Sequence, residues 1–175
     1  MEATDRLVFP DGSSYAFVEK PADPEHEPLV MEFVIQPDAL GPPPHVHPAP
    51  QRETFEVTDG EFELRHGSDW KRVRAGESLT VEPGTVHTFR NRSGAPVHVR
   101  NVHDPAHGFE RYIRGIHAVV SDHGFERVTP KAALYMALLW GEHPDTIRPA
   151  NAPMAAGLAA LRGAARAMRL RLPSY

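Results

Sequence analysis

Residues 41–60 read GPPPHVHPAPQRETFEVTDG, and the interpretation of the whole chain starts from this stretch. His45 and His47 are two residues apart, so on a β-strand they point to the same face. The three prolines at 42–44 favour an extended approach and exclude a helix in front of them. From Glu53 to Thr58 the residues alternate as in a strand, and Asp59-Gly60 follows as a strong hairpin signal.

Two imidazoles on one strand and a carboxylate on its neighbour can converge on a single metal ion. They supply the nitrogen and oxygen ligands that suit Fe, Mn, Ni, Co or Zn. A further imidazole, His87, lies in residues 76–91, GESLTVEPGTVHTFRN, where a turn at 82–84 precedes a new strand. A lone His-x-His pair is usually structural. Here the pair is followed by a glutamate strand and then by His87, and these three elements in this order favour a bound metal.

These two stretches resemble the paired motifs of the cupin superfamily. The first motif has two histidines separated by one residue, then a glutamate, then six residues before a glycine, and Glu53 and Gly60 have that last spacing. The second motif has the glycine, histidine and asparagine spacing of Gly84, His87 and Asn91. The resemblance implies one divalent transition metal ion (Fe, Ni, Mn or Zn) with four ligands, His45, His47, Glu53 and His87.

The chain departs from the family pattern between and around these motifs. Gly41 is closer to the first histidine than is usual, and Glu82 stands where the second motif has a proline. Five residues separate His47 from the glutamate, where three or four are usual. This longer loop leaves Gln51 and Glu56 as alternatives to Glu53 for the oxygen ligand.

Composition excludes several classes of protein. The chain has 175 residues, enough for one domain with a proper core, and it contains no cysteine, which excludes disulfides, zinc–thiolate sites and thiol nucleophiles. The formal net charge of -4 argues against nucleic acid or an anionic membrane as the partner. The chain shows neither a membrane-length apolar run nor a signal-peptide pattern in its first ten residues, so a cytoplasmic location is expected.

The spacing of turn signals predicts a β-rich fold. Strands are expected at residues 6–9, 14–19, 30–35, 53–58, 61–66, 70–74, 78–81, 86–90 and 96–103. This pattern indicates an antiparallel sandwich or barrel, and the resemblance selects an all-β jelly-roll barrel over residues 1–104. Residues 105–175 are expected to form a C-terminal tail of two to three α-helices, packed on the barrel or on a dimer partner.

Alternation along the strands predicts which side chains face inward. If Glu53 faces inward, Phe55 does as well, and Phe89 follows His87 in the same way. Both phenylalanines are expected to line the substrate pocket, although core packing explains them equally well. In strand 96–103 the apolar count favours the face that carries Asn101 and His103, which would then contact substrate. The alternative face would turn Arg100 inward, and the direction of Glu32 in strand 30–35 is left open.

Helical spacing begins after Pro105. A first helix is expected to end at His123-Gly124, and a second to start at Thr129-Pro130 with threonine as N-cap and proline as the first helical residue. After a proline-rich link at 142–153, a third helix is expected to carry one apolar face, made of Leu158, Leu161, Ala165 and Met168. By resemblance, this helix and the hairpin at residues 6–19 are the expected contacts of a homodimer.

Three functions fit this chain. The first is a metal-dependent dioxygenase of quercetinase-like type, acting on a small aromatic or enolisable substrate, with Glu53 able to leave the metal and act as a catalytic base. The second is a metal-dependent cyclase or isomerase for a polyketide-like substrate, with zinc as Lewis acid. The third is a non-catalytic cupin that binds a small molecule. All three rest on the resemblance, because one fold supports many chemistries.

Overall fold

The structure is a computed structural model that describes residues 5–39, 41–124 and 129–175. Eleven strands and three helices are found in these residues. The first strands are β1 (Asp5–Val8), β2 (Ser14–Glu19), β3 (Leu29–Ile35), β4 (His45–Val46), β5 (Arg52–Asp59) and β6 (Glu61–His66). They are followed by β7 (Asp69–Arg74), β8 (Ser78–Val81), β9 (His87–Arg90), β10 (Val97–Asp104), α1 (Phe109–His123), α2 (Pro130–Glu142), β11 (Arg148–Pro149) and α3 (Ala152–Ala167).

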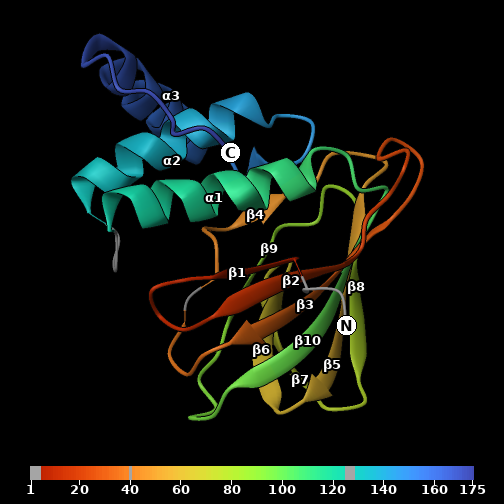
Figure 1. The fold of residues 1–175 in the computed structure, drawn as a ribbon. Coiled ribbons are helices and arrows are strands. Elements are labelled where there is room, and N and C mark those ends of the chain that lie inside the picture. The colour runs from red at the N-terminus through yellow and green to blue at the C-terminus, as the bar shows by residue number, and fades with distance from the viewer. Residues whose placement is uncertain (1–4, 40, 125–128) are drawn as a thin grey trace.

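The strands form two antiparallel sheets that face each other (Figure 1). One sheet has the order β1-β2-β3-β10-β5-β8, and the other has the order β11-β4-β9-β6-β7. This is the jelly-roll fold with a helical tail that the sequence predicts. Among the described residues, no pair of hydrogen-bonded strands joins the two sheets into one closed barrel, so the fold is a sandwich of two sheets.

Alternating burial shows which face of each long strand looks inward. In β10 the residues Val97, Val99, Asn101 and His103 are buried, and the residues between them are more exposed, which confirms the first of the two predicted faces. Glu32 in β3 is exposed, while its neighbours Met31 and Phe33 are buried. The side chain of Glu32, whose direction the sequence left open, therefore points outward.

The core fills the space between the sheets and continues under the helices. Phe55, Phe62 and Leu64 are at most 1% exposed and lie among buried aliphatic side chains of β3, β5 and β10. The same cluster includes Phe109 of α1 and Trp140 of α2. One continuous apolar core thus joins the sandwich to its helical tail.

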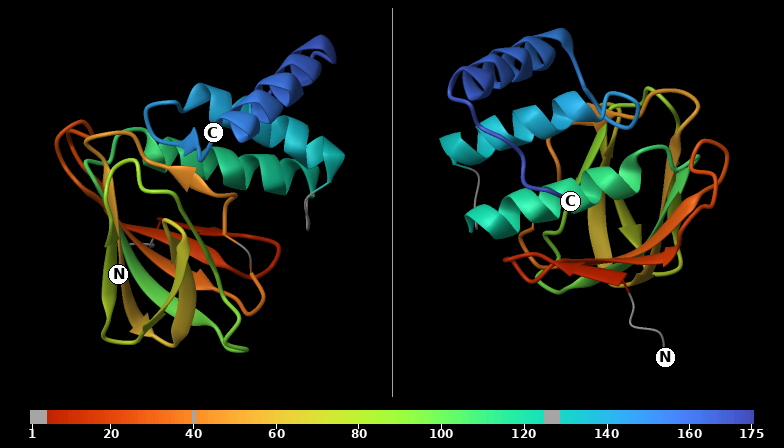
Figure 2. Two further views of the ribbon diagram at one scale, coloured as in Figure 1. Left: turned by 180° about the vertical axis from the view of Figure 1, so that it is seen from behind. Right: turned by 45° about the horizontal axis from the view of Figure 1, so that its top comes forward.

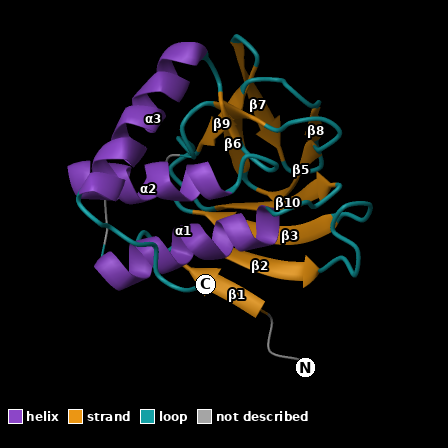
Figure 3. Cartoon of the chain, turned by 90° about the horizontal axis from the view of Figure 1, so that it is seen from above, coloured by secondary structure: helices purple, strands orange, loops and turns teal. Residues whose placement is uncertain are grey.

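The helices form a layer against the end of the sandwich where β4 lies (Figures 1 and 2). Seen from above, α1 and α2 run side by side and α3 lies over α2 (Figure 3). The predicted caps of the first two helices are confirmed: Gly124 has φ of 60°, and the Thr129 hydroxyl accepts a hydrogen bond from the Ala132 amide at 3.0 Å. None of the helices among the described residues is long and apolar enough to span a membrane.

Two parts of the helical tail differ from the prediction. The third helix begins at Ala152, within the expected link, because Asn151 caps it through its side chain and Pro153 suits its first turn. The link also contains β11, whose residues Arg148 and Pro149 pair with Val46 and His45 of β4. The tail therefore extends the sheet that carries His45 in β4 and His87 in β9.

Candidate metal centre

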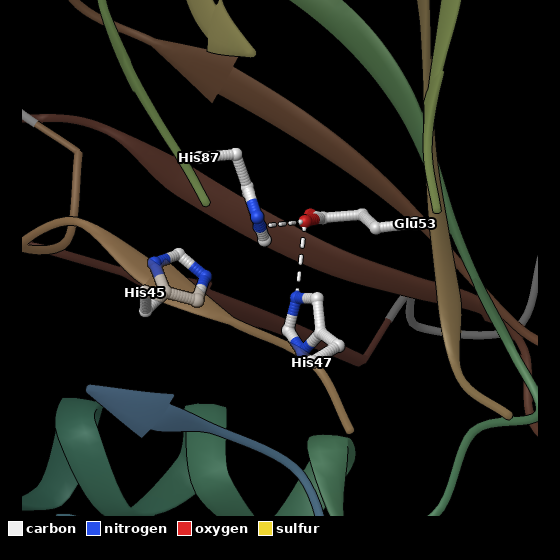
Figure 4. A group of neighbouring side chains, drawn as sticks. All are labelled: His45, His47, Glu53 and His87. Atoms are coloured by element: carbon white, nitrogen blue, oxygen red, sulfur yellow. Dashed lines mark hydrogen bonds and ion pairs between the residues drawn. The ribbon is translucent and has the colours of Figure 1, made fainter. Parts of the chain in front are cut away.

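Three imidazoles and one carboxylate meet between the two sheets (Figure 4). Each of His45, His47, Glu53 and His87 offers a ligand atom, and these four atoms lie within 4.8 Å of one another. All four residues are at most 4% exposed. The structure therefore brings together the four residues that the sequence predicts as ligands.

The pairing of the strands explains why the four side chains meet. His45 in β4 lies opposite His87 in β9, and both strands belong to the five-stranded sheet. Glu53 belongs to β5 of the facing sheet, where it is paired with His103 of β10. His47 directly follows β4 and points inward like His45. The candidate site thus depends on the correct packing of one sheet against the other.

Each of the three ligand imidazoles is held from behind by a backbone carbonyl. The Nδ1 atoms of His45, His47 and His87 lie 3.0, 2.6 and 3.0 Å from the carbonyl oxygens of Pro43, Thr146 and Thr85, respectively. A carbonyl only accepts hydrogen bonds, so each Nδ1 carries the proton and donates it. This arrangement leaves the Nε2 lone pair free to bind a metal, and it is the usual outer shell of a metal-binding histidine.

The contacts inside the group fit a cation better than they fit hydrogen bonds. The Nε2 atoms of His87 and His47 lie 2.9 and 3.2 Å from Oε2 of Glu53. With the protons on Nδ1, two lone pairs face a carboxylate oxygen with no hydrogen between them. Burial, followed by the neighbouring histidines, lowers the pKa of His45 well below its usual range, which keeps this imidazole neutral. The donor set therefore matches a divalent transition metal.

Glu53 is ionised in this environment. Burial by itself raises its pKa, but the neighbouring His103 imidazole lowers that pKa well below its usual value. Oε1 of Glu53 accepts a hydrogen bond from Nδ2 of Asn101 at 2.8 Å and lies 3.2 Å from Nε2 of His103. Asn101 and His103, expected as substrate contacts, thus lie against the ligand carboxylate.

The helical tail supplies one wall of the group. The ring of Phe109 is stacked on His103 with 3.4 Å between the ring centroids, and it meets His47 edge-on at 5.9 Å. Trp140 meets His45 edge-on at 6.3 Å. Both aromatic residues lie in stretches where helices are expected from the sequence, but the sequence does not predict that they lie near the site. Helical spacing marks them only as buried, and no local motif connects Phe109 to His47, 62 positions away, or Trp140 to His45, 95 positions away.

The other predicted residues lie outside the group of four. Phe55 and Phe89 pack with Phe62 at centroid distances of 5.8 to 6.1 Å, so core packing accounts for their burial. Of the alternative oxygen ligands, Gln51 donates its amide to the carbonyls of residues 105 and 106. Glu56 forms an ion pair with Arg100 in which both side chains are about 40% exposed. Neither can replace Glu53.

Comparison with known protein families supports the presence of a cupin domain in this chain. The family model described as "Cupin domain" matches residues 31–103, which contain all four candidate ligands. No curated protein matches the chain. An RmlC-like cupin from Shewanella frigidimarina is 20% identical, with 62% of this chain and 90% of that chain covered and a TM-score of 0.53.

Two further solved structures are similar to this chain. A sugar phosphate isomerase from a cupin superfamily, from Silicibacter pomeroyi, is 20% identical, with 59% of this chain and 72% of that chain covered and a TM-score of 0.50. A protein with a double-stranded β-helix domain from Klebsiella pneumoniae is 25% identical, covers 53% of this chain and 76% of its own, and has a TM-score of 0.46. At 20% identity, the likeness to the Shewanella and Silicibacter structures describes the fold alone.

Proposed function

We propose that this chain is a metal-dependent enzyme of the cupin superfamily, with His45, His47, Glu53 and His87 as metal ligands, because residues 31–103 match the cupin domain model and contain all four residues. The observation that carries the proposal is the arrangement of the imidazoles. Three Nδ1–H groups are committed to backbone carbonyls, and the free Nε2 lone pairs converge with a carboxylate. A bound metal of this kind polarises a substrate oxygen and, if it is redox-active, supports reaction with O₂.

The residues of the chain bind and orient the reactants. Four protein ligands leave one or two positions for substrate on a five- or six-coordinate metal. The aromatic rings of Phe109 and Trp140 lie beside the ligand imidazoles and exclude water from that side. These apolar rings suit a small aromatic or enolised substrate. That Phe55 and Phe89 also contact substrate stays a prediction.

The reaction class that we propose first is dioxygenation of a small aromatic or enolisable compound. The test is an O₂ electrode trace of the metal-loaded protein, recorded with a panel of flavonols and catechols. Consumption of O₂ above the blank, lost in His87→Ala and retained in His143→Ala, supports the proposal. His143 is the matched control because it is a buried histidine that is not a member of the ligand group.

The same assay separates the alternatives. Disappearance of substrate without consumption of O₂ would indicate a cyclase or isomerase, in which the metal acts as a Lewis acid. Saturable binding of a compound that is recovered unchanged would indicate a binding protein. Failure of every compound to bind to the metal-loaded protein would contradict the proposed substrate class.

We also retain the proposal of a homodimer in the cytoplasm. Leu161 in α3 is 36% exposed and Met168, the C-cap of this helix, is 62% exposed; the exposed positions around them are alanine, glycine, Arg166 and Arg169. Such a face is suited to packing against another helix. Light scattering at micromolar concentration should give about twice the mass of 19.4 kDa, and a monomeric mass would contradict the proposal.

A further inference from the structure

We propose that Asn101 is a positioning residue that fixes Glu53 as a one-oxygen metal ligand. The proposal rests on the metal site proposed above and goes beyond it. It assigns the two oxygens of the carboxylate to different tasks, with Oε2 facing the imidazoles and Oε1 held by Asn101.

The strand register places Asn101 in reach of this carboxylate. In the pairing of β10 with β5, Asn101 is opposite Phe55, and His103 is opposite Glu53. Asn101 is therefore the diagonal neighbour of Glu53 on the inward face, a separation that long side chains can bridge. Its Nδ2 atom donates to Oε1 at 2.8 Å, and both residues are at most 4% exposed.

The contacts of the two oxygens differ. Oε2 lies near the Nε2 atoms of His47 and His87, where the metal would be bound. Oε1 accepts a hydrogen bond from the Asn101 amide at 2.8 Å, and the Nε2 atom of His103 lies further away, at 3.2 Å. Without the Asn101 amide, Glu53 could rotate about its terminal bond and present both oxygens to the metal.

This geometry also affects the idea that Glu53 leaves the metal to act as a base. Such a movement would break a buried hydrogen bond to a charged group, which is among the stronger ones in proteins. Asn101 thus orients the ligand carboxylate rather than contacting substrate. We infer that Glu53 remains a fixed ligand during turnover.

The test uses the full chain loaded with Co²⁺, whose visible absorption reports coordination number. Asn101→Leu keeps the volume of the side chain but removes the donor, and Asn101→Ala removes both. We expect both variants to bind Co²⁺ about 10- to 100-fold more weakly in a chelator competition. We also expect the same weakened visible bands in both, because a second carboxylate oxygen would join the metal.

The matched control is Val99→Ala, two residues earlier on the same inward face and 2% exposed. It perturbs the core without touching Glu53, so its Co²⁺ spectrum should equal that of the wild type. Should the Asn101 variants not fold, Asn101→Ser provides a shorter donor for the same measurements. Unchanged affinity and spectrum in the folded Asn101 variants would overturn this inference alone. Wild-type protein that takes up no Co²⁺ would instead overturn the proposed metal site.

Discussion

Replacing Glu53 with glutamine should have opposite effects on stability without and with metal. In the metal-free protein, the carboxylate oxygen Oε2 faces two imidazole lone pairs, at 2.9 Å from His87 and 3.2 Å from His47. A glutamine amide would place N–H donors at this position, while its oxygen still accepts the hydrogen bond from Asn101. The substitution therefore converts two contacts between acceptors into hydrogen bonds and removes a buried charge.

The magnitude follows from these two contacts. At about 1 kcal/mol for each new hydrogen bond, metal-free Glu53→Gln should be about 2 kcal/mol more stable than the metal-free wild type. For a chain of this size that is about 4–8 °C in Tm. Metal at 1,000 times its Kd should stabilise the wild type by about 4.1 kcal/mol. If the variant binds metal 100-fold more weakly, the stabilisation that the same metal concentration gives it falls to about 1.4 kcal/mol.

The assay is thermal unfolding of both proteins, first in excess chelator and then with Zn²⁺ or Mn²⁺. Val99→Ala, which leaves Glu53 and its contacts in place, is the control for general damage to the core. A metal-free variant that melts below the metal-free wild type would refute the reasoning on lone pairs. Equal gains from metal in both proteins would refute the role of Glu53 as a ligand.

Three further substitutions test the supports of the fold and site. Asn91→Ala should lower the unfolding free energy by about 2–4 kcal/mol in urea titration, because its amide bonds the carbonyls of Ile35 and Ala95 at 3.0 and 2.8 Å; a loss below 1 kcal/mol would contradict this. Gly115→Val should cost about 1–3 kcal/mol by the same method, since an added Cβ would already meet Leu139 at 2.5 Å; unchanged stability would show that the helices separate freely. Trp140→Ala should speed removal of metal by a chelator in stopped-flow measurements, because this ring covers His45, and an unchanged rate would place the route of entry elsewhere.

The ligand group was predicted from the resemblance to the cupin motifs, and the local patterns of the chain agree with it. The His-x-His spacing, the hairpin at Asp59-Gly60 and the turn before His87 each act within a few residues, and strand periodicity then fixes the inward direction of each side chain. The inward face of β10 was predicted for the same reason. Where alternation was balanced, as at Glu32, the sequence could not choose, because the answer depends on which sheet covers that face.

Contacts between distant segments were not predictable. The carbonyl that orients His47 belongs to Thr146, 99 residues away, and a backbone carbonyl has no signal in the sequence. The two-residue strand β11 is too short for periodicity to detect. The predicted apolar face of α3 was partly wrong: Ala165 is buried and Leu158 half-buried, but Leu161 and Met168 are exposed. A helix at the edge of the molecule buries a narrower stripe than its apolar residues suggest.

The central claim is that four side chains from two sheets hold one metal ion. The most direct test is the metal content of protein purified without chelators or added metal, measured by inductively coupled plasma mass spectrometry, for the wild type, the double variant His45→Ala/His87→Ala and the control His143→Ala. We predict close to one transition metal ion per chain in the wild type and the control, and almost none in the double variant. A wild type that contains no metal and takes up none when it is supplied would contradict the claim.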